Sequence, residues 1–374
     1  MVKIALDAMG GDRAPAVVVE GALLAVKELG VHIALVGQRD LVEKELARHS
    51  DHSASIEVVP ASQTISMDES PSTALKKKDS SMKVAIELVK RGAAQAVVSA
   101  GNSGAMMATG MFVLGKLPGV DRPAILVVVP TSGKGTVIID AGANVDCKPR
   151  HLLEFGLMGA IYAERVLGIG EPRVGILSNG EEESKGNDLT RAASELLSNS
   201  PLNYIGYVEG RDIFAKAVHV VVCDGFTGNV ALKTMEGVAS FVIEVLKEAF
   251  QQSIFSRLGY LLSRRSLLHA YNRLDHTEHG GAPLLGLDGV GIIAHGGSDP
   301  KAIKNAVRIA QETVSHDVNR RIVEGLVGLG EIAEDGEDKF PRKLWQHLKS
   351  KTSTFNEEPI PEQEREESKS GGKD

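Results

Sequence analysis

The sequence predicts an α/β fold in which a largely parallel, mixed sheet lies between two layers of helices. Short continuous apolar runs, such as 2–6 and 218–222, alternate with segments whose apolar residues follow helical spacing. Continuous apolar runs are typical of strands that are covered on both faces. Several of these runs lead directly into clusters of glycine and polar residues. The pattern predicts a single three-layer αβα domain over residues 1–335.

The individual elements follow from the same two patterns. Strands are expected at 2–6, 31–36, 56–59, 95–99, 124–129, 136–139, 173–177, 203–208 and 218–222. Helices are expected at 15–29, 39–48, 80–92, 149–167, 229–250 and 300–327. Gly92 is typical of a helix C-terminal stop, and Pro149 suits a first helical turn. Gly133–Thr136 lacks the upstream glycine of a P-loop, so we expect a hairpin turn between two strands there.

Two segments differ from this alternation. Residues 252–279 carry Ile254, Phe255, Leu258, Leu261 and Leu262 at helical spacing, with arginines nearby. They predict a helical excursion over about 250–280 that contacts either a second subunit or a membrane surface. Residues 336–374 form a C-terminal extension with almost no apolar side chains beyond about 356, where we expect disorder.

Composition excludes several classes of protein. A net charge of -7 over 374 residues argues against bulk nucleic-acid binding. The two cysteines, Cys147 and Cys223, fit a reduced compartment and no disulfide framework. We find no apolar run of about 18 residues and no N-terminal targeting signal, so we expect a cytoplasmic protein. The eleven histidines show no metal-ligand spacing, and we expect neither metal nor cofactor.

Four glycine-polar clusters follow predicted strands and indicate where a ligand binds. They are Asp7–Asp12, Ala100–Ala105, Asp140–Asn144 and Cys223–Asn229. Ligands of open α/β sheets bind at the carboxyl ends of strands, and glycines there let backbone N–H groups approach an anion. If the four loops converge, they form a site for phosphate or a similar small anion. The first cluster lacks the G-x-G-x-x-G spacing of a dinucleotide site and has a tight turn as its alternative.

Four residues in these clusters have a structural alternative to a role in a site. Asn102 or Ser103 either caps a helix or helps to bind an anion, and the two are geometrically compatible. Asn229 either caps the long helix that follows or donates its amide to a carbonyl group. Cys223 is either a nucleophile or a buried, inert thiol, and the inert thiol is favoured because no histidine lies nearby in the sequence.

Two further polar segments carry candidate charges. Lys185 lies in the polar segment Asn179–Asn187, where it either holds a phosphate or a developing oxyanion as a point charge or belongs to a solvated loop. Asn187 is the expected N-cap of the helix that follows this loop. His295, in Ala294–Asp299, is either an acid, base or phosphate contact, or a loop histidine held by the backbone.

Taken together and in this order, the clusters resemble the bacterial phosphate acyltransferases of phospholipid synthesis, the acyl-ACP:phosphate transacylases, over about residues 1–330. The resemblance implies an αβα fold related to isocitrate and isopropylmalate dehydrogenases and to phosphotransacetylases, and it implies a homodimer. It also implies that orthophosphate attacks the thioester of a long-chain acyl carrier protein (ACP), giving acyl phosphate and free ACP. A glycerol-phosphate acyltransferase would then consume the acyl phosphate, and the enzyme would associate peripherally with the membrane.

The resemblance also implies roles for particular residues. Lys185 and Asn229 would be the catalytic pair. Phosphate and substrate would be bound by Asp7, Gly10, Gly11, Asn102, Ser103, Gly104, Asn144, Asp224, Thr227 and His295. Because ACP is strongly acidic, its docking site should be basic, and contacts to ACP or the membrane are expected from Lys76, Lys77, Lys78, Leu258, Leu261, Arg264 and Arg265. The alternative to an ACP or membrane contact is that these residues form a solvated face or, for 252–268, that they pack against the other subunit.

Three other functions remain open at this point. The first is a phosphotransacetylase that uses acetyl-CoA. The second is a decarboxylating dehydrogenase of the same fold, which needs a divalent metal and a nicotinamide site, and we find no adequate constellation for either. The third is a non-enzymatic scaffold that recruits lipid-synthesis enzymes to the membrane.

Overall fold

The computed structural model describes residues 1–49, 54–215, 217–274 and 280–335. The chain divides into two compact units, residues 1–326 and 327–374. Every candidate site residue named above belongs to the first unit. The expected disordered extension, 336–374, lies outside the described residues.

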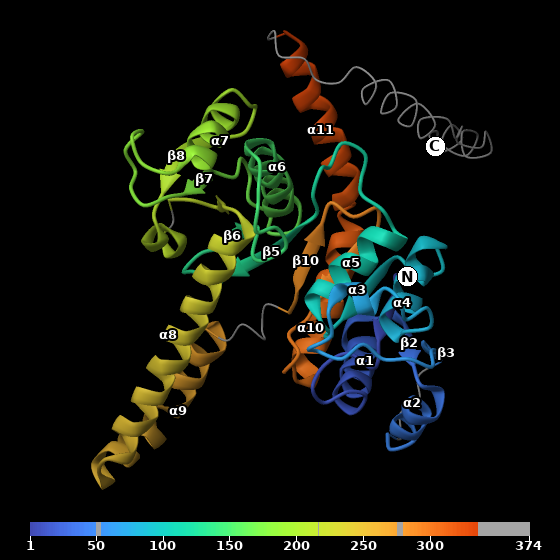
Figure 1. Cartoon of the computed structure of the whole chain (residues 1–374). Helices are drawn as coiled ribbons and strands as arrows, with labels where there is room; N and C mark the ends of the chain where they lie inside the picture. The colour runs from blue at the N-terminus through green and yellow to red at the C-terminus, as the bar shows by residue number, and fades with distance from the viewer. Residues whose placement is uncertain (50–53, 216, 275–279, 336–374) are drawn as a thin grey trace, which may run out of the picture. The chain divides into compact units, whose positions relative to one another are not determined.

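The described part of the first unit contains an 11-stranded sheet (Figure 1). The strands are β1 (Lys3–Asp7), β2 (His32–Gly37), β3 (Ile56–Pro60), β4 (Ala96–Ser99), β5 (Ala124–Val129), β6 (Thr136–Ile139), β7 (Val174–Leu177), β8 (Tyr204–Val208), β9 (Val220–Val222), β10 (Ala282–Leu285) and β11 (Val290–Ile293). Their order is β3-β2-β1-β4-β11-β10-β5-β6-β9-β7-β8. β10 and β11 lie in a region where the sequence indicated only an apolar run.

Two parallel blocks make up this sheet. β3, β2, β1, β4 and β11 are mutually parallel, and so are β6, β9, β7 and β8. Between the blocks, β10 is antiparallel to β11 and β5, and β5 is antiparallel to β6. The predicted mixed, largely parallel sheet is confirmed. The pairing also means that the two blocks run in opposite directions, so their loops leave opposite ends of the strands.

The helices connect and cover these strands. They are α1 (Ala16–Leu29), α2 (Arg39–Leu46), α3 (Pro71–Ala74), α4 (Ser81–Lys90), α5 (Ser103–Val113), α6 (Pro149–Arg165), α7 (Asp188–Ser198), α8 (Gly225–Gln251), α9 (Ile254–Leu274), α10 (Pro300–Ser315) and α11 (Val318–Asp335), with a short 3-10 helix at Gly210–Phe214. Gly92 follows α4 with a φ of 70°, and Pro149 begins α6, as the sequence predicted. The hairpin turn between β5 and β6 is also confirmed.

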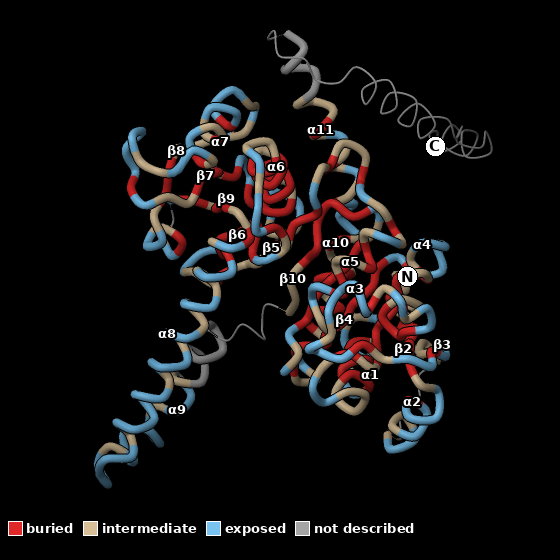
Figure 2. Tube along the Cα trace, in the orientation of Figure 1, coloured by how far each residue is buried: buried red, intermediate tan, exposed pale blue. Residues whose placement is uncertain are grey.

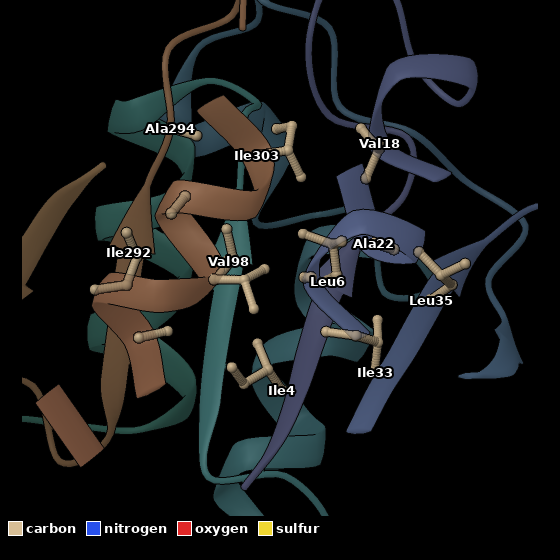
Figure 3. Packing of buried hydrophobic residues seen from close by; sticks show 14 of the residues in the cluster. Ile4, Leu6, Val18, Ala22, Ile33, Leu35, Val98, Ile292, Ala294 and Ile303 are labelled. Carbon is tan, nitrogen blue, oxygen red and sulfur yellow. The ribbon is translucent and has the colours of Figure 1, made fainter. Parts of the chain in front are cut away.

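Side chains of the strands alternate between two apolar layers, and the strands are the most deeply buried part of the chain (Figure 2). Ile4 and Leu6 of β1 belong to one core cluster with residues of α1 and α10, and Figure 3 shows Leu6 beside Ala22 of α1. Ala5, between them, belongs to a separate core cluster that includes residues of α4 and α5. Burying one such aliphatic side chain contributes about 2–3 kcal/mol, so both helical layers stabilise the sheet.

Two helix predictions were wrong in their boundaries. The segment 300–327 is broken into α10 and α11 at Asp317, whose φ of 54° is left-handed. Aspartate tolerates that conformation better than most residues, so the break costs little. The helix expected at 229–250 begins at Gly225 instead, because the Asp224 side chain accepts a hydrogen bond from Thr227 N at 2.9 Å and caps the helix.

α8 and α9 contact each other and form a helical hairpin that is largely exposed (Figure 2). The buried residues of α8 are Gly225 and Gly228, both in its first turn. The Phe250 and Tyr260 rings, 5.4 Å apart between centroids, join the two helices near the hairpin tip. The predicted helical spacing is confirmed as far as Leu274. Among the described residues, no helix has both the length and the apolar character needed to cross a membrane.

Candidate functional site

The first group of predicted site residues lies at the carboxyl ends of β1, β4 and β11, which are adjacent parallel strands. Asp7 is almost fully buried and accepts hydrogen bonds from Ser99 Oγ at 2.7 Å and from Met9 N at 3.2 Å. Gly101 N in turn donates to Ser99 Oγ at 3.1 Å. Burial raises the pKa of Asp7, and the bonds that it accepts oppose this shift. Asp7 therefore ties the loop after β1 to the loop after β4.

Glycines permit the close approach of these loops. A Cβ atom on Gly10 would lie 2.7 Å from Gly101 N and 2.8 Å from Asp7 Oδ2. Gly11 has a φ of 102°, and the next residue, Asp12, donates its N–H to Gly296 O at 2.9 Å. The loops after β1, β4 and β11 thus meet backbone to backbone. Two of the four glycine clusters that we expected to converge, after β1 and β4, lie together here, and the loop after β11 joins them.

Asn102 caps α5, which confirms the capping alternative. Its Oδ1 accepts a hydrogen bond from Ala105 N at 2.9 Å. Its Nδ2 donates to Met67 O at 2.8 Å and to Glu69 O at 2.9 Å. The Asn102 side chain therefore holds the 67–69 loop against the helix N-terminus. Ser103 and Gly104 are exposed in the first turn of α5, beside the glycine loops.

His295 is exposed at the end of β11, and its Nδ1 accepts a hydrogen bond from Gly297 N at 3.1 Å. The backbone thus orients the ring, and a neutral imidazole carries its proton on Nε2. Arg13 stabilises the same loop by donating from Nη2 to Ser298 O at 2.9 Å and to Gly297 O at 3.2 Å. Sequence analysis missed Arg13, although its place directly after Gly11-Asp12 was a signal.

The second group lies at the carboxyl ends of β6, β9 and β7, again adjacent and parallel. Its centre is the fully buried carboxylate of Asp140. Oδ1 accepts hydrogen bonds from the backbone N–H groups of Ile125, Gly142 and Ala143 at 3.0–3.1 Å. Oδ2 accepts from Asn144 N at 2.7 Å and Asn144 Nδ2 at 2.9 Å. Burial raises the pKa of Asp140, and these bonds oppose that shift.

The N-terminus of α8 packs directly on the Asp140 loop. Gly225 N donates to Asn144 O at 2.7 Å. A Cβ atom on Gly228 would lie 1.9 Å from Asp140 O and 2.9 Å from Cys223 Sγ, so only glycine fits there. Cys223 is 2% exposed, its Sγ donates to Asp140 O, and burial raises its pKa well above the usual range. The predicted burial of the Cys223 thiol is confirmed.

Asn229 lies one turn further along α8 and is exposed. The capping alternative for Asn229 was wrong, because Asp224 is the N-cap and also accepts a hydrogen bond from Thr227 Oγ1 at 2.7 Å. The Asn229 side chain instead lies over Gly142, where an added Cβ atom would be 3.6 Å from its Cβ and Cγ atoms. Its amide thus stands beside the Asp140 loop.

Lys185 follows β7 in a loop braced by its own polar side chains. Asn179 Oδ1 accepts a hydrogen bond from Gly186 N at 3.0 Å, and Asn187 caps α7, as predicted. The half-buried Lys185 stem crosses Gly180, where a Cβ atom would lie 2.8 Å from its Cγ. Within the described part of the chain, no hydrogen bond or ion pair engages Lys185 Nζ. Because β9 lies between β6 and β7, the loops that carry Lys185 and Asn229 leave neighbouring strands at the same end.

The structure therefore sorts the four predicted loops into two groups instead of one. Asp7, Gly10, Gly11, Asn102, Ser103, Gly104 and His295 belong to the first group, and Asn144, Asp224, Thr227, Asn229 and Lys185 belong to the second. The two groups sit on the two oppositely directed blocks of strands. No cluster of three His, Cys, Asp or Glu side chains that could hold a metal occurs among the described residues.

The residues expected to contact ACP or a membrane lie on two other segments, 76–78 and α9, and the first of these is tied to the first group through Glu69. Lys77 donates to Glu69 Oε2 at 2.6 Å and to Thr64 O at 2.7 Å, whereas Lys76 and Lys78 are exposed. Four more of these residues are exposed on α9: Leu258, Leu261, Arg264 and Arg265.

Comparison with known proteins shows the family to which the chain belongs. Residues 2–321 match the profile of a family described as fatty acid synthesis protein. A phosphate acyltransferase from Geotalea uraniireducens is 56% identical over 326 residues, which cover 87% of this chain and 94% of that protein. A phosphate acyltransferase from Geobacter sulfurreducens is 52% identical over 86% of this chain and 94% of its own length. The chain belongs to this family of phosphate acyltransferases. Family membership confirms the expectation of an acyl-transferring enzyme.

Solved structures share the fold. A phosphotransacetylase from Streptococcus pyogenes matches with a TM-score of 0.57 and 17% identity, covering 84% of this chain and 94% of that one. A 4-hydroxythreonine-4-phosphate dehydrogenase from Klebsiella pneumoniae matches with a TM-score of 0.50 and 12% identity, covering 84% and 99%. These similarities confirm the predicted relation to phosphotransacetylase and dehydrogenase folds.

A buried carboxylate that the sequence analysis missed supports the second group. Glu154 on α6 accepts hydrogen bonds from Asp121 N at 2.8 Å and Arg150 Nε at 2.9 Å. It thereby fixes the segment before β5, where Pro123 O accepts a hydrogen bond from Asn144 Nδ2 at 2.7 Å. Burial raises the pKa of Glu154 to about 7, against the opposing effect of the Asp121 hydrogen bond.

This shift predicts a pH dependence of stability. The folded state keeps the Glu154 proton up to about pH 7, whereas its usual pKa is 4.5. The contribution of protonated Glu154 to the free energy of unfolding is thus fully present below pH 4.5 and is lost as the pH rises to 7. Each pKa unit is worth about 1.4 kcal/mol, so the difference in unfolding free energy between wild type and Glu154→Gln should change by about 3 kcal/mol across this window. Urea unfolding at several pH values measures it, and parallel curves would contradict the assignment.

The packing of α8 predicts the effect of a single methyl group. Gly228→Ala must displace the start of α8 from the Asp140 loop and move Asn229 with it, because the new Cβ atom would overlap Asp140 O. A shift of about 1 Å in a side chain that acts in catalysis can cost about 100-fold in rate, so we expect a loss of kcat of that order if Asn229 has the role that the sequence predicts. Gly237→Ala, in the same helix with open space around it, is the matched control. Equal kcat for both variants would show that the helix start does not position the site.

Proposed function

We propose that this enzyme transfers a long-chain acyl group from acyl-ACP to orthophosphate, giving acyl phosphate and free ACP as an early step of phospholipid synthesis. Family membership over most of the chain supports the acyl transfer to phosphate. The single structural observation that carries the proposal is the placement of Lys185 and Asn229 on loops of neighbouring strands, at one end of the second strand block.

In the proposed reaction a phosphate oxygen attacks the thioester carbonyl carbon directly. The carbonyl oxygen becomes an oxyanion, the C–S bond then breaks, and the ACP thiolate leaves and takes up a proton. Lys185 would neutralise phosphate or the oxyanion, and the Asn229 amide would donate to the same centre. One such donor is worth roughly 3–4 kcal/mol in the transition state. The buried Cys223 thiol, whose pKa is raised, supports a mechanism without a covalent enzyme intermediate.

Backbone groups are proposed to hold the phosphate and acyl-phosphate moieties. The candidates in the first group are Gly10, Gly11, Ser103 and Gly104, because a helix N-terminus and closely packed glycines direct N–H groups toward an anion. In the second group, Asn144 holds the Asp140 loop beneath Asn229. Asp7, Asn102, Asp224 and Thr227 fix these loops through the hydrogen bonds described above, and His295 presents its ring at the edge of the first group.

We also propose that the enzyme is a cytoplasmic homodimer and that it contacts the membrane peripherally through the α8–α9 hairpin. Phe255 is 86% exposed, Leu261 65% and Leu258 53%, and Arg264 and Arg265 lie on the same helix. Apolar side chains next to arginines suit the surface of an anionic membrane. The acyl phosphate, with its apolar chain, would pass from there to a glycerol-phosphate acyltransferase.

Lys185→Ala should lower turnover at least about 100-fold, because it removes the proposed charge from the oxyanion or phosphate. The measurement is release of free thiol from palmitoyl-ACP, with and without orthophosphate and with EDTA present. Lys44→Ala, an exposed lysine of α2, should retain full activity. Near-normal turnover of Lys185→Ala would remove this residue from the mechanism. If the wild type released thiol from acetyl-CoA and not from palmitoyl-ACP, the phosphotransacetylase alternative would replace the proposal.

Leu258→Glu combined with Leu261→Glu should weaken binding to anionic liposomes at least about tenfold, because it puts two charges into the proposed apolar contact. Liposome co-sedimentation measures binding, and size-exclusion chromatography checks the oligomeric state. Leu196→Glu, at an exposed leucine of α7, is the control. Unchanged liposome binding by a folded double variant would place the membrane contact elsewhere.

A further inference from the structure

α5 is apolar on every side, although one of its faces is open. Ser103–Val113 contains no charged residue. Ala105, Met106, Thr109 and Gly110 form its buried face. On the opposite side, Met107 and Met111 are half-buried against the core, Ala108 is half-buried, and Phe112 is exposed. A helix that is apolar all round is normally covered on all sides, and within the described residues Phe112 is the member of this face that is left largely uncovered.

Phe112 is the most prominent side chain of this face. It is 72% exposed, and Lys83 Nζ of α4 lies 6.0 Å from the centroid of its ring. A large exposed aromatic ring beside a cation is typical of the residues that dominate protein–protein binding energy. Met107 and Met111 flank it along the helix, and methionine side chains adapt to differently shaped partners.

Positive charge surrounds this apolar face. Residues 76–91 contain six Lys and Arg side chains and two acidic ones, within a chain of net charge -7. α3 and α4, which bracket the exposed Lys76 and Lys78, both contact α5 (Figure 1). We call Lys76, Lys78, Lys83, Met107, Met111 and Phe112 the α5 surface. It combines an apolar centre with a basic rim.

We propose that the α5 surface docks an acidic protein, with Phe112 as the apolar anchor, and that this partner is the carrier that presents the acyl thioester. The identity of the partner rests on the proposed function. α5 begins at Ser103 in the first group of loops, and Phe112 lies nine residues further on, about 13 Å along the helix axis. A carrier bound there would sit beside the glycine loops and leave them open to its thioester arm.

A second copy of the chain fits the α5 surface poorly. A symmetric dimer contact would place the same patch on both sides, so lysines would face lysines. Like charges across an interface are unfavourable, whereas an acidic partner gains complementary attraction and faster association. An anionic membrane is the remaining competitor, and the experiment includes it.

The test compares Phe112→Ala and Lys83→Glu with two matched controls, Leu196→Ala and Lys44→Glu, which are exposed leucine and lysine positions on α7 and α2. The KM for palmitoyl-ACP should rise at least about tenfold in both test variants, while kcat and the KM for phosphate stay within about twofold. The Kd for ACP without an acyl group, measured by calorimetry, should rise in parallel. Raising the salt concentration should weaken ACP binding to the wild type more than to Lys83→Glu.

Several outcomes would overturn the inference. An unchanged KM for palmitoyl-ACP, or a fall in kcat alone, would show that the α5 surface does not dock the carrier. Loss of anionic-liposome binding without a change in the KM would assign the surface to the membrane. If the wild type releases no thiol in a phosphate-dependent manner, the proposed function fails. The calorimetric comparison still decides the inference, because absence of ACP binding by the wild type, or equal binding by Phe112→Ala, contradicts it.

Discussion

The buried carboxylate of Asp140 is the interaction on which the rest of the second group depends. It accepts five hydrogen bonds, and through them it sets the conformation of the 140–144 loop. α8 then starts on that loop, in contact so close that Gly225 and Gly228 must lack side chains. A buried carboxylate with this many partners is costly to disturb, because each unsatisfied group would forfeit about 1–3 kcal/mol. Asp140 therefore fixes the position of Asn229 through the 140–144 loop on which α8 begins.

The first group is organised on the same principle. Asp7 is buried at the end of β1 and is held by Ser99 at the end of β4, while Asn102 uses its whole amide to join α5 to the 67–69 loop. Most polar side chains of these motifs form hydrogen bonds that hold the loops in place. In the proposed function, the exposed backbone and the few exposed side chains, such as Ser103, contact the ligand. Rigid loops of this kind hold donors in place before substrate arrives, which is where electrostatic catalysis gains most.

Two apolar surfaces are left open by the single chain, and they differ in character. The α8–α9 hairpin exposes Phe255, Leu258 and Leu261 along a projecting element that carries arginines. The α5 surface is a compact patch around Phe112 with lysines at its rim. In the proposed function the enzyme takes its substrate from a protein carrier and delivers an apolar product, and the two surfaces would serve these two contacts. Separate surfaces allow both to be occupied together.

The sequence by itself determined the fold class, the order of most strands and helices, and the identity of the glycine loops, because apolar periodicity and glycine placement are local signals. It also indicated Lys185 and Asn229 through their motifs. Only the tertiary structure decided which loops meet, because that depends on strand pairing between distant segments: β10 and β5 reverse the sheet and divide the four loops into two groups. The role of Glu154 could not be found from the sequence, since its partner, Asp121 N, is a backbone atom brought near by folding. The place of Arg13 after Gly11-Asp12 was a signal, but only folding shows that its partner is Ser298 O. The sequence placed the start of α8 too late for a similar reason. The glycines at 225 and 228 argue against a helix there, but the close packing of the helix start on Asp140 and its loop requires them.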